Sequence, residues 1–470
     1  MSIELFTTKF SNIGEQIFLR CDPKYRHFWD NSNGQVLKET NANIPLKDII
    51  SPLHKQVLRK GPLFEECFLL GIDTSEPRDG QLRNLPAAIE IKSDKLLLKD
   101  ADIIITKLGT TRGYIFENNL KGQNLIGSTE LIPYKLINDS YLPAFLKYLL
   151  LLPPYLSAYA YLESGKTPSH WRVNPLDLLR IKIPEIRKDL QLEILQKVEP
   201  IQKRINALKD GLSNSVEIIN RVFAREFRYS LREYEKRAKK KTYQRSFSAL
   251  DKVFLLRGTV KFQHPKYDYL DEILKNYPWI KLKTVCSEPI HRGVQPKYDT
   301  NGEVLVVKTI NLKHEILDFS ESERVALEFF EVNKGAEIKE NDILVSSTGE
   351  GRGKVDIYEL EEPGIGDTHI SIIRLKDDIN PYYVLYFMRS LLGKLQLETL
   401  EIAIKGTPEI YSYQLAQMRI IAISPKKQEL IVNEIQEELK ELQKQKAEIE
   451  RIRGQIDEIF LQAIMKEDRK

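Results

Sequence analysis

Residues 100–113 read Asp-Ala-Asp-Ile-Ile-Ile-Thr-Lys-Leu-Gly-Thr-Thr-Arg-Gly, and residues 340–353 read Glu-Asn-Asp-Ile-Leu-Val-Ser-Ser-Thr-Gly-Glu-Gly-Arg-Gly. The two stretches align without a gap at a separation of 240 positions, so Asp102 matches Asp342 and Arg112 matches Arg352. In each stretch an apolar, largely β-branched run predicts a strand, and the glycines after it predict a loop. A repeat this long indicates a duplicated domain rather than a solenoid.

Further phrases extend the repeat on both sides of these stretches. The matching pairs are 44–50 with 280–285, Gly165-Lys-Thr-Pro168 with Gly406-Thr-Pro408, and 181–184 with 421–425. Residues 143–159 and 381–397 each begin with proline and predict one helix. Residues 1–43 are irregular, and we interpret them as an N-terminal extension or early strands.

Each half then ends in a segment with the heptad pattern of a long helix. Such a 3.5-residue apolar repeat, kept over four or more heptads, requires a partner helix. We expect the two helices to bind each other as an antiparallel coiled coil that holds the globular halves apart; alternatively, each helix packs on its own domain. The seam residues are Ile194, Val198, Ile201, Ile205, Leu208, Leu212 and Ile219 in the central helix, and Ile435, Leu442, Ile449, Ile452, Ile456 and Ile459 in the distal helix.

The composition is that of a protein with two or three domains, each large enough for its own core. Of 470 residues, 42% are hydrophobic and 29% charged, and the three cysteines lie far apart without metal-ligand spacing, which favours a reducing compartment. No signal peptide or membrane-spanning run is predicted. The net charge of +4 says little by itself, but residues 225–245 hold nine Lys and Arg. That run is either a solvated helix end with a linker or a phosphate contact.

Motifs of catalysis are missing from the sequence. It has no phosphate loop of standard spacing, no Gly-rich loop for S-adenosylmethionine and no convincing nuclease-like carboxylate cluster. The histidines are scattered, and none lies at metal-ligand spacing with another ligand. We therefore predict no catalytic site, no metal and no cofactor; a site built from residues far apart in sequence is the alternative.

Basic and hydroxyl side chains gather instead on loops that follow the predicted strands. Arg112 and Arg352 each follow a Gly-containing turn, where an arginine can bond two acceptors of a guanine edge or clamp a phosphate. The alternative is a structural salt bridge back to Asp102 or Asp342. The loops differ between the halves while the frame is kept, as two different specificities require. The candidate DNA-binding residues are Lys107, Arg112, Lys166, Thr167, His170, Arg172, Arg292, Gln295, Lys297, Arg352, Lys354, Lys405 and Thr407.

The order of recognition domain, long helix, recognition domain and long helix resembles the specificity (S) subunit of type I restriction–modification systems. The resemblance covers about residues 44–470 and includes Asp342-Ile-Leu-Val-Ser-Ser-Thr-Gly349 and Ile423-Ser-Pro-Lys-Lys-Gln-Glu-Leu-Ile431. In the family a Pro-x-x-x-Gln phrase usually ends both recognition domains. The first half departs from it with the looser Pro184-Glu-Ile-Arg-Lys-Asp-Leu-Gln191.

The resemblance implies an α+β protein with two tandem α/β target recognition domains joined by two long helices in an antiparallel coiled coil. The implied domains are 1–187 (first recognition domain with N-terminal extension), 188–238 (central helix and basic linker), 239–425 (second recognition domain) and 426–470 (distal helix).

The same resemblance implies a non-catalytic, cytoplasmic subunit of a bacterium or archaeon. Each recognition domain would read one half of a bipartite, asymmetric site in double-stranded DNA, and the helices would set the spacer. Two methyltransferase subunits would dock on the helices, and restriction–translocase subunits would join that core. Methyl transfer, base flipping and cleavage would belong to those partners. A non-catalytic DNA- or protein-binding scaffold of another phage-defence complex is the alternative.

Overall fold

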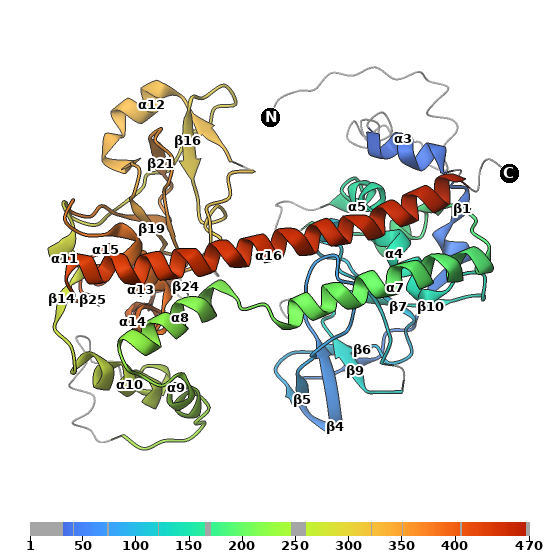
Figure 1. Ribbon diagram of the computed structural model, residues 1–470, viewed down its shortest axis with the longest axis horizontal. Helices are drawn as coiled ribbons and strands as arrows, with labels where there is room; N and C mark the ends of the chain where they lie inside the picture. Colours follow the sequence, from blue (N-terminus) through green and yellow to red (C-terminus); the bar gives the residue numbers. More distant parts are fainter. Residues whose placement is uncertain are drawn as a thin grey trace. The chain divides into compact units, whose positions relative to one another are not determined.

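The chain contains two copies of one mixed helix-and-strand fold (Figure 1). The structure is a computed structural model that describes residues 32–40, 42–72, 75–120, 122–164, 171–245, 260–320, 322–349, 351–404 and 407–466. Two compact units can be distinguished. The first unit holds the described residues up to Asp210 together with those from Ala447 onward, and the second unit holds residues 211–446.

An antiparallel four-stranded sheet lies at the centre of each unit. Its strand order is β2 (Ile50–Pro52), β10 (Leu131–Leu136), β7 (Ile103–Thr106), β8 (Ile115–Glu117) in the first unit, and β15 (His291–Arg292), β22 (Ile370–Ile373), β19 (Ile343–Ser346), β20 (Val355–Ile357) in the second. The registers agree, because Ile104 faces Phe116 as Leu344 faces Asp356. The strands predicted from the repeated stretch are β7 and β19, and all their residues are buried.

A second sheet also repeats. β4 (Gly61–Leu70) pairs in parallel with β9 (Leu125–Gly127), as β16 (Val304–Val307) does with β21 (Gly364–Gly366). In the first unit the strand order of this sheet is β3 (Val57–Leu58), β6 (Lys95–Leu97), β9, β4, β5 (Ala87–Ile91). In the second unit it is β18 (Glu337–Ile338), β21, β16, β17 (Arg324–Val325). Apart from the additional β3, the two sheets have one topology, as a duplicated domain requires.

Short ladders close both copies in the same way. β1 (Ile44–Pro45) pairs with β13 (Lys182–Ile183), as β14 (Trp279–Lys281) pairs with β25 (Arg419–Ile421). β11 (Glu163–Ser164) pairs with β12 (Arg172–Val173), as β23 (Ile402–Ile404) pairs with β24 (Thr407–Glu409). The other short elements of the described residues are α3 (Ser32–Glu39), η1 (Leu46–Asp48), η2 (Thr110–Arg112), α6 (Pro175–Leu178), η5 (Val260–Gln263), α10 (Pro265–Leu274), α11 (Leu282–Val285), α12 (Leu327–Val332), η6 (Lys334–Ala336) and α15 (Ser412–Leu415). The helix α3 falls in the stretch that the sequence predicted to be irregular or extended.

Each helix predicted after the second sheet is a pair of helices. Residues 143–159 form α4 (Pro143–Leu151) and α5 (Pro153–Tyr159), and the second copy forms α13 (Pro381–Arg389) and α14 (Leu391–Leu400). The breaks are at Leu152 and Ser390, which both have extended backbone. Leu152 precedes a proline, whose ring disfavours helical backbone at the residue before it. The prediction of one continuous helix in each half is therefore wrong.

The predicted central helix is also interrupted. It consists of α7 (Lys188–Asp210) and α8 (Ser215–Glu226), followed by α9 (Leu231–Ala238). Asn214 starts α8 with a capping box. Its side chain accepts a hydrogen bond from the Glu217 backbone N–H, and the Glu217 carboxylate accepts one from the Asn214 backbone N–H. A capping box marks a helix start, so residues 211–214 cannot continue α7. Leu212, predicted as a seam residue, lies in this break.

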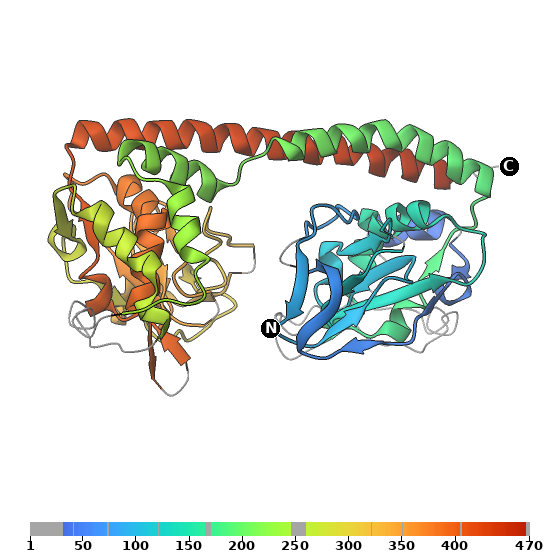
Figure 2. The same ribbon diagram turned by 90° about the horizontal axis from the view of Figure 1, so that it is seen from below.

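The distal helix α16 (Pro425–Lys466) is continuous over 42 residues, and it contributes to both units. In the second unit, Arg221 pairs with Glu438 and Arg225 pairs with Glu434, so α8 and the first part of α16 run antiparallel, as Figure 2 shows. In the first unit, Arg204 of α7 lies 3.2 Å from Glu448 of α16.

The apolar stripes of these helices belong to the cores of the two units. Phe460 of α16 packs on Phe145 and Tyr148 of α4, with ring centres 4.9 and 5.6 Å apart. Ile219 of α8 and Ile435 of α16 lie in the main core of the second unit. The distal helix thus serves both copies of the fold, rather than packing on one domain. The buried seam residues are Ile194, Val198, Ile205, Ile219, Ile435, Leu442, Ile449, Ile452 and Ile456, whereas Ile201, Leu208 and Ile459 are half-buried.

Candidate nucleic-acid interface

The turns after β7 and β19 place one arginine each at the end of the central sheet. Glycines at both ends of each turn have left-handed backbone, with φ of 65° at Gly109, 81° at Gly113, 74° at Gly349 and 78° at Gly353. Glycine adopts this conformation without a steric penalty. In both turns the backbone N–H of the arginine donates a hydrogen bond to the carbonyl of the first glycine, at 3.0 Å for Arg112 and 3.3 Å for Arg352. The repeated glycines therefore fix the same turn twice.

A buried aspartate anchors the strand before each turn. Asp102 forms an ion pair with Lys135 at 3.5 Å, and Asp342 accepts hydrogen bonds from Arg374 at 2.9 and 2.7 Å. Burial raises the pKa of Asp342, and the Arg374 hydrogen bonds oppose that shift. Both cations come from the neighbouring strand at equivalent positions. Lys135 lies near the end of β10, and Arg374 directly follows β22. The salt bridges predicted as an alternative for the turn arginines are therefore wrong.

A glutamate lies beside each turn arginine instead. Nε of Arg352 lies 3.0 Å from Oε1 of Glu401, and the Arg352 side chain is 24% exposed. Arg112 is exposed and makes no salt bridge with a described residue. Burial raises the pKa of Glu163, and the positive charge of the nearby Arg112 opposes that shift. A carboxylate that binds some of the N–H groups of a guanidinium leaves the others free to donate to a phosphate or a base edge.

In the first unit, two candidate basic residues, Lys107 and Arg172, lie together with Glu130 beside the turn. Arg172 donates to both carboxylate oxygens of Glu130, at 3.0 and 3.2 Å, and Lys107 lies 3.9 Å from the same carboxylate. The hydrogen bond from Arg172 lowers the pKa of Glu130, and desolvation lowers the pKa of Lys107. Two cations around one anion leave the cluster with a net positive charge.

In the second unit, Arg292 occupies the corresponding region from a different strand. It pairs with Glu409, donates to the Ile410 carbonyl at 2.8 Å, and lies over the Tyr411 ring with its guanidinium carbon 5.2 Å from the ring centre. This stacking holds the guanidinium plane in a fixed orientation.

Backbone hydrogen bonds show which residues of the two units are equivalent. Val173 donates to the Lys107 carbonyl as Ile410 donates to that of Ser347, both at 2.9 Å. Lys107 donates to the Glu130 carbonyl as Ser347 donates to that of His369, both at 2.8 Å. The set Lys107, Glu130, Arg172 therefore corresponds to Ser347, His369, Glu409. On the same backbone, the lysine, glutamate and arginine of the first unit are replaced by serine, histidine and glutamate in the second.

The remaining candidates are less constrained or lie outside the described residues. Gln295 and Lys297 are exposed after β15, and Lys354 is half-buried in the turn before β20. Thr407 starts β24. Lys166, Thr167, His170 and Lys405 lie outside the described residues.

Sequence reasoning missed the acids of this interface. Glu130, Glu163, Glu401 and Glu409 each lie beside a predicted basic residue that is distant in sequence, so no local spacing reveals the pairs. One signal was present: Glu163 and Glu401 both come shortly before the repeated Gly-Lys-Thr-Pro and Gly-Thr-Pro phrases.

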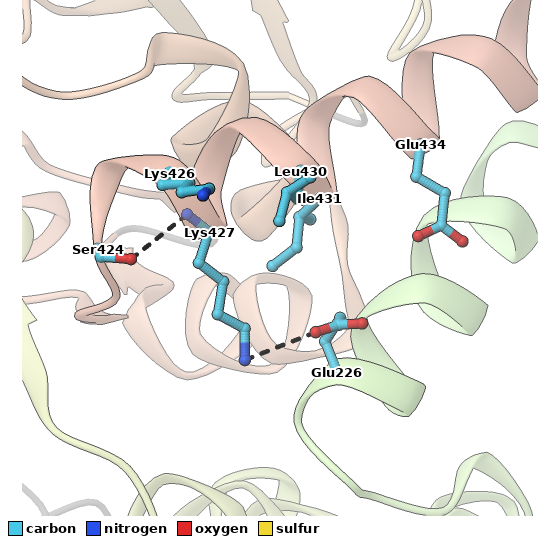
Figure 3. A pocket seen from close by; sticks show the side chains of 7 residues that line it. All are labelled: Glu226, Ser424, Lys426, Lys427, Leu430, Ile431 and Glu434. Carbon is cyan, nitrogen blue, oxygen red and sulfur yellow. Dashed lines mark hydrogen bonds and ion pairs between the residues drawn. The ribbon is translucent and has the colours of Figure 1, made fainter.

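Away from this interface, α8 and the start of α16 enclose a pocket of about 290 Å³ (Figure 3). Its lining is Glu226, Ser424, Lys426, Lys427, Leu430, Ile431 and Glu434. Nζ of Lys427 lies 3.6 Å from Glu226, and Glu434 pairs with Arg225. Two acids and two lysines balance, so the pocket does not favour an ion of either sign.

Neither a metal centre nor a membrane crossing is found in the part of the chain that the structure describes. There, no three His, Cys, Asp or Glu side chains come together as a cation site. None of its helices combines the length and the apolar composition that crossing a bilayer needs.

Three structures are among the solved structures that are similar to this chain. One comes from work on complex assembly and conformational transition of the type I R-M system; it is 16% identical, covers 90% of this chain and 96% of its own, and has a TM-score of 0.34. The HsdS subunit from Thermoanaerobacter tengcongensis is 16% identical over the same shares, with a TM-score of 0.30. The type I restriction–modification S subunit from M. genitalium is 14% identical, covers 89% of this chain and 94% of its own, and has a TM-score of 0.35. No protein-family model matches the chain, and no curated protein sequence does. The two subunits belong to the class that the sequence pattern resembles.

Proposed function

We propose that this chain is the sequence-reading subunit of a type I restriction–modification complex, in which each unit reads one half of a bipartite DNA site. One observation carries the proposal: the same strand and glycine turn occurs twice, each time with an arginine beside a glutamate, while the charges around it differ. A repeated frame with different side chains suits two half-sites of different sequence. Base edges are distinguished by hydrogen bonds, and arginine to guanine is the commonest specific contact.

The helices would serve as the spacer and as the docking surface. Their apolar stripes are buried inside the chain, so we place the methyltransferase contact on the exposed polar face of α16, which includes Glu437, Lys440 and Glu441. Restriction–translocase subunits would join the same assembly, and methyl transfer would take place on the methyltransferase. Half-site spacing set by protein geometry follows the logic of dimeric repressors.

Selection from random duplexes tests this proposal directly. The full chain, co-expressed with the methyltransferase encoded nearest to it, should enrich DNA with two short fixed sequences separated by a spacer of constant length. Its affinity should fall steeply with salt, because phosphate contacts release counterions. Enrichment of no sequence by the assembled complex would refute the proposal and favour a scaffold role.

A length change tests the spacer. Seven residues, two helical turns, would be inserted in α16 after Lys446, and a matching insertion would lengthen the 211–214 connection. We expect the accepted spacer to change while both half-site sequences stay the same. An unchanged spacer would exclude the helices as its determinant.

A further inference from the structure

Exposed cations gather on α9 and on the residues just before and after it, outside the repeated frame. Of the nine basic residues in 225–245, Arg225, Arg237 and Arg245 pair with Glu434, Glu272 and Asp268. The other six are exposed and make no ion pair with any residue that the structure describes. We call these six the α9 basic face: Arg228, Arg232, Lys236, Lys239, Lys240 and Lys241.

Helix geometry aligns the α9 basic face. Arg232 and Lys236 are four residues apart in α9 and share one side of it. Arg228 precedes the helix at a left-handed φ of 43°, and Lys239 continues its last turn with right-handed helical backbone. The carboxylates of α9 are Glu233, which pairs with Arg237, and the exposed Glu235, so the six cations outnumber the acids beside them. Such an excess attracts a polyanion.

A chain of contacts leads from the lysine end of α9 to the arginine turn of the same unit. The His264 ring, at the start of α10, lies 3.0 Å from the Lys240 carbonyl. Lys266 of α10 bonds Glu398 of α14 at 2.5 Å, and Glu401, just after α14, holds Arg352. Figure 1 shows α9 and α10 side by side. The basic face is therefore connected to the recognition edge through two packed helices.

We infer that the α9 basic face binds phosphate groups of the DNA that flanks the half-site of the second unit, without reading bases. The inference rests on the proposed function and adds a surface to it. Long exposed side chains on the outside of a helix suit phosphates, which position a protein on DNA but carry no sequence information. An acidic protein surface is the competing partner, but the link to the arginine turn favours DNA.

This contact belongs to one unit. The element before the first frame is α3, in which Lys38 is the one basic residue, and nothing like the pair α9–α10 is found among the described residues of the first unit. Protection of the DNA backbone should therefore extend further beyond the half-site of the second unit than beyond the other.

The test compares two triple variants of the full chain in complex with its methyltransferase. Arg232→Gln, Lys236→Gln and Lys239→Gln together remove three charges from the basic face. The matched control, Lys275→Gln, Lys281→Gln and Lys283→Gln, removes three exposed charges beyond the other end of α10. The readout is affinity for selected and scrambled duplexes over a series of salt concentrations, with hydroxyl-radical footprints of the selected duplex.

The basic-face variant should lower the slope of log affinity against log salt by about 0.9 for each phosphate that the protein no longer binds, so by about 2–3 in all. The decrease should be the same on selected and scrambled DNA, and protection outside one half-site should disappear. The control, and a variant with Arg232→Lys, Lys236→Arg and Lys239→Arg, should keep the wild-type slope. Equal thermal unfolding curves would show that all variants are folded.

Two results would overturn the inference. One is an unchanged slope in the basic-face variant; the other is weaker assembly with the methyltransferase at an unchanged slope, which would assign the face to a protein partner. The proposed function fails separately, if the wild-type complex selects no sequence. In that case a lower slope in the variant would still support the phosphate contact.

Discussion

The two units share a backbone but differ in what fills equivalent places, inside as well as on the surface. In the first unit the position facing Ile104 is the buried Phe116, and α4 ends with the buried Leu151. In the second unit the same positions hold Asp356 and Arg389, which form an ion pair that is almost fully buried. The comparison teaches that strand pairing and glycine turns preserve this fold, while its side chains can change even from apolar to charged.

The largest effect should come from breaking that buried pair by replacing Arg389 with leucine, the residue at the equivalent position of the first unit. Arg389→Leu leaves the Asp356 carboxylate buried without its partner, and breaking such a pair costs about 3–5 kcal/mol. The free energy of unfolding would be measured in urea by the fluorescence of Trp279 in the second unit, with Trp29 and Trp171 replaced by phenylalanine. The double change Asp356→Phe with Arg389→Leu should cost less than the single change, because no charge is left buried. A double variant that is less stable than Arg389→Leu would contradict this explanation.

A pH dependence should distinguish the units next. Burial, with the nearby charge of Arg389, lowers the pKa of His314 from 6.5 to about 4. The unfolded chain then binds more protons than the folded one between these values, so the second unit should lose up to about 3 kcal/mol of stability as the pH falls from about 6.5 to about 4. The corresponding loop of the first unit, residues 71–86, contains no histidine.

Hydrogen exchange at pH 5 and pH 7.5 would locate this loss of stability. His314→Asn should reduce the pH dependence of the second unit and leave the first unit unchanged, since asparagine tolerates the left-handed backbone of this position, φ 66°. The same pH dependence with and without His314 would assign the effect to other groups.

Recognition should respond to the turn arginines one half-site at a time. Arg352→Ala should weaken binding of the half-site read by the second unit by about 1–3 kcal/mol if the contact is bidentate to guanine, and Arg112→Ala should do the same at the other half-site. Competition with duplexes altered in one half-site measures the two losses. Equal losses at both half-sites in either variant would remove the assignment of one arginine to one half.

The smallest effect should come from ion pairs between the helices. In the second unit, Glu434→Gln breaks the pair with Arg225; in the first, Glu448→Gln breaks the pair with Arg204. Exposed pairs typically contribute about 0.2–1 kcal/mol, and salt screens them. Urea unfolding at low and high salt should therefore show small losses that vanish at high salt. A loss that persists at high salt would mean that the carboxylate has a packing role.

The sequence predicts the parts of this fold that depend on local chemistry. β7 and β19 follow from β-branched runs, and the turns after them follow from glycines that the left-handed backbone requires. The helix breaks at Leu152 and Asn214 had signals too, a following proline and a capping box, but the first was overlooked inside a predicted helix and the second inside a continuous heptad pattern.

Pairings between distant residues are the part that no pattern revealed. Asp102 binds Lys135, and Arg352 binds Glu401, because sheet register and the placement of β23 bring them together. Charge alone allowed several partners for each, and the salt bridge considered as an alternative, between the turn arginine and the strand aspartate, does not form. The candidate basic residues stay predictions, whereas the acids beside them became visible in the folded chain.

The second part of α16 has a consequence for how the protein is made. Phe460 fills the space beside Phe145 and Tyr148, and Asp457 binds Arg78 at 2.5 Å, so the first unit is completed by residues that are synthesised after the whole of the second unit. Until the second part of α16 is made, the earlier-made half carries an uncovered apolar surface, the kind of surface through which nascent chains aggregate. A premature stop codon just after Lys446 would therefore damage the first unit, although it is encoded first, and spare the second.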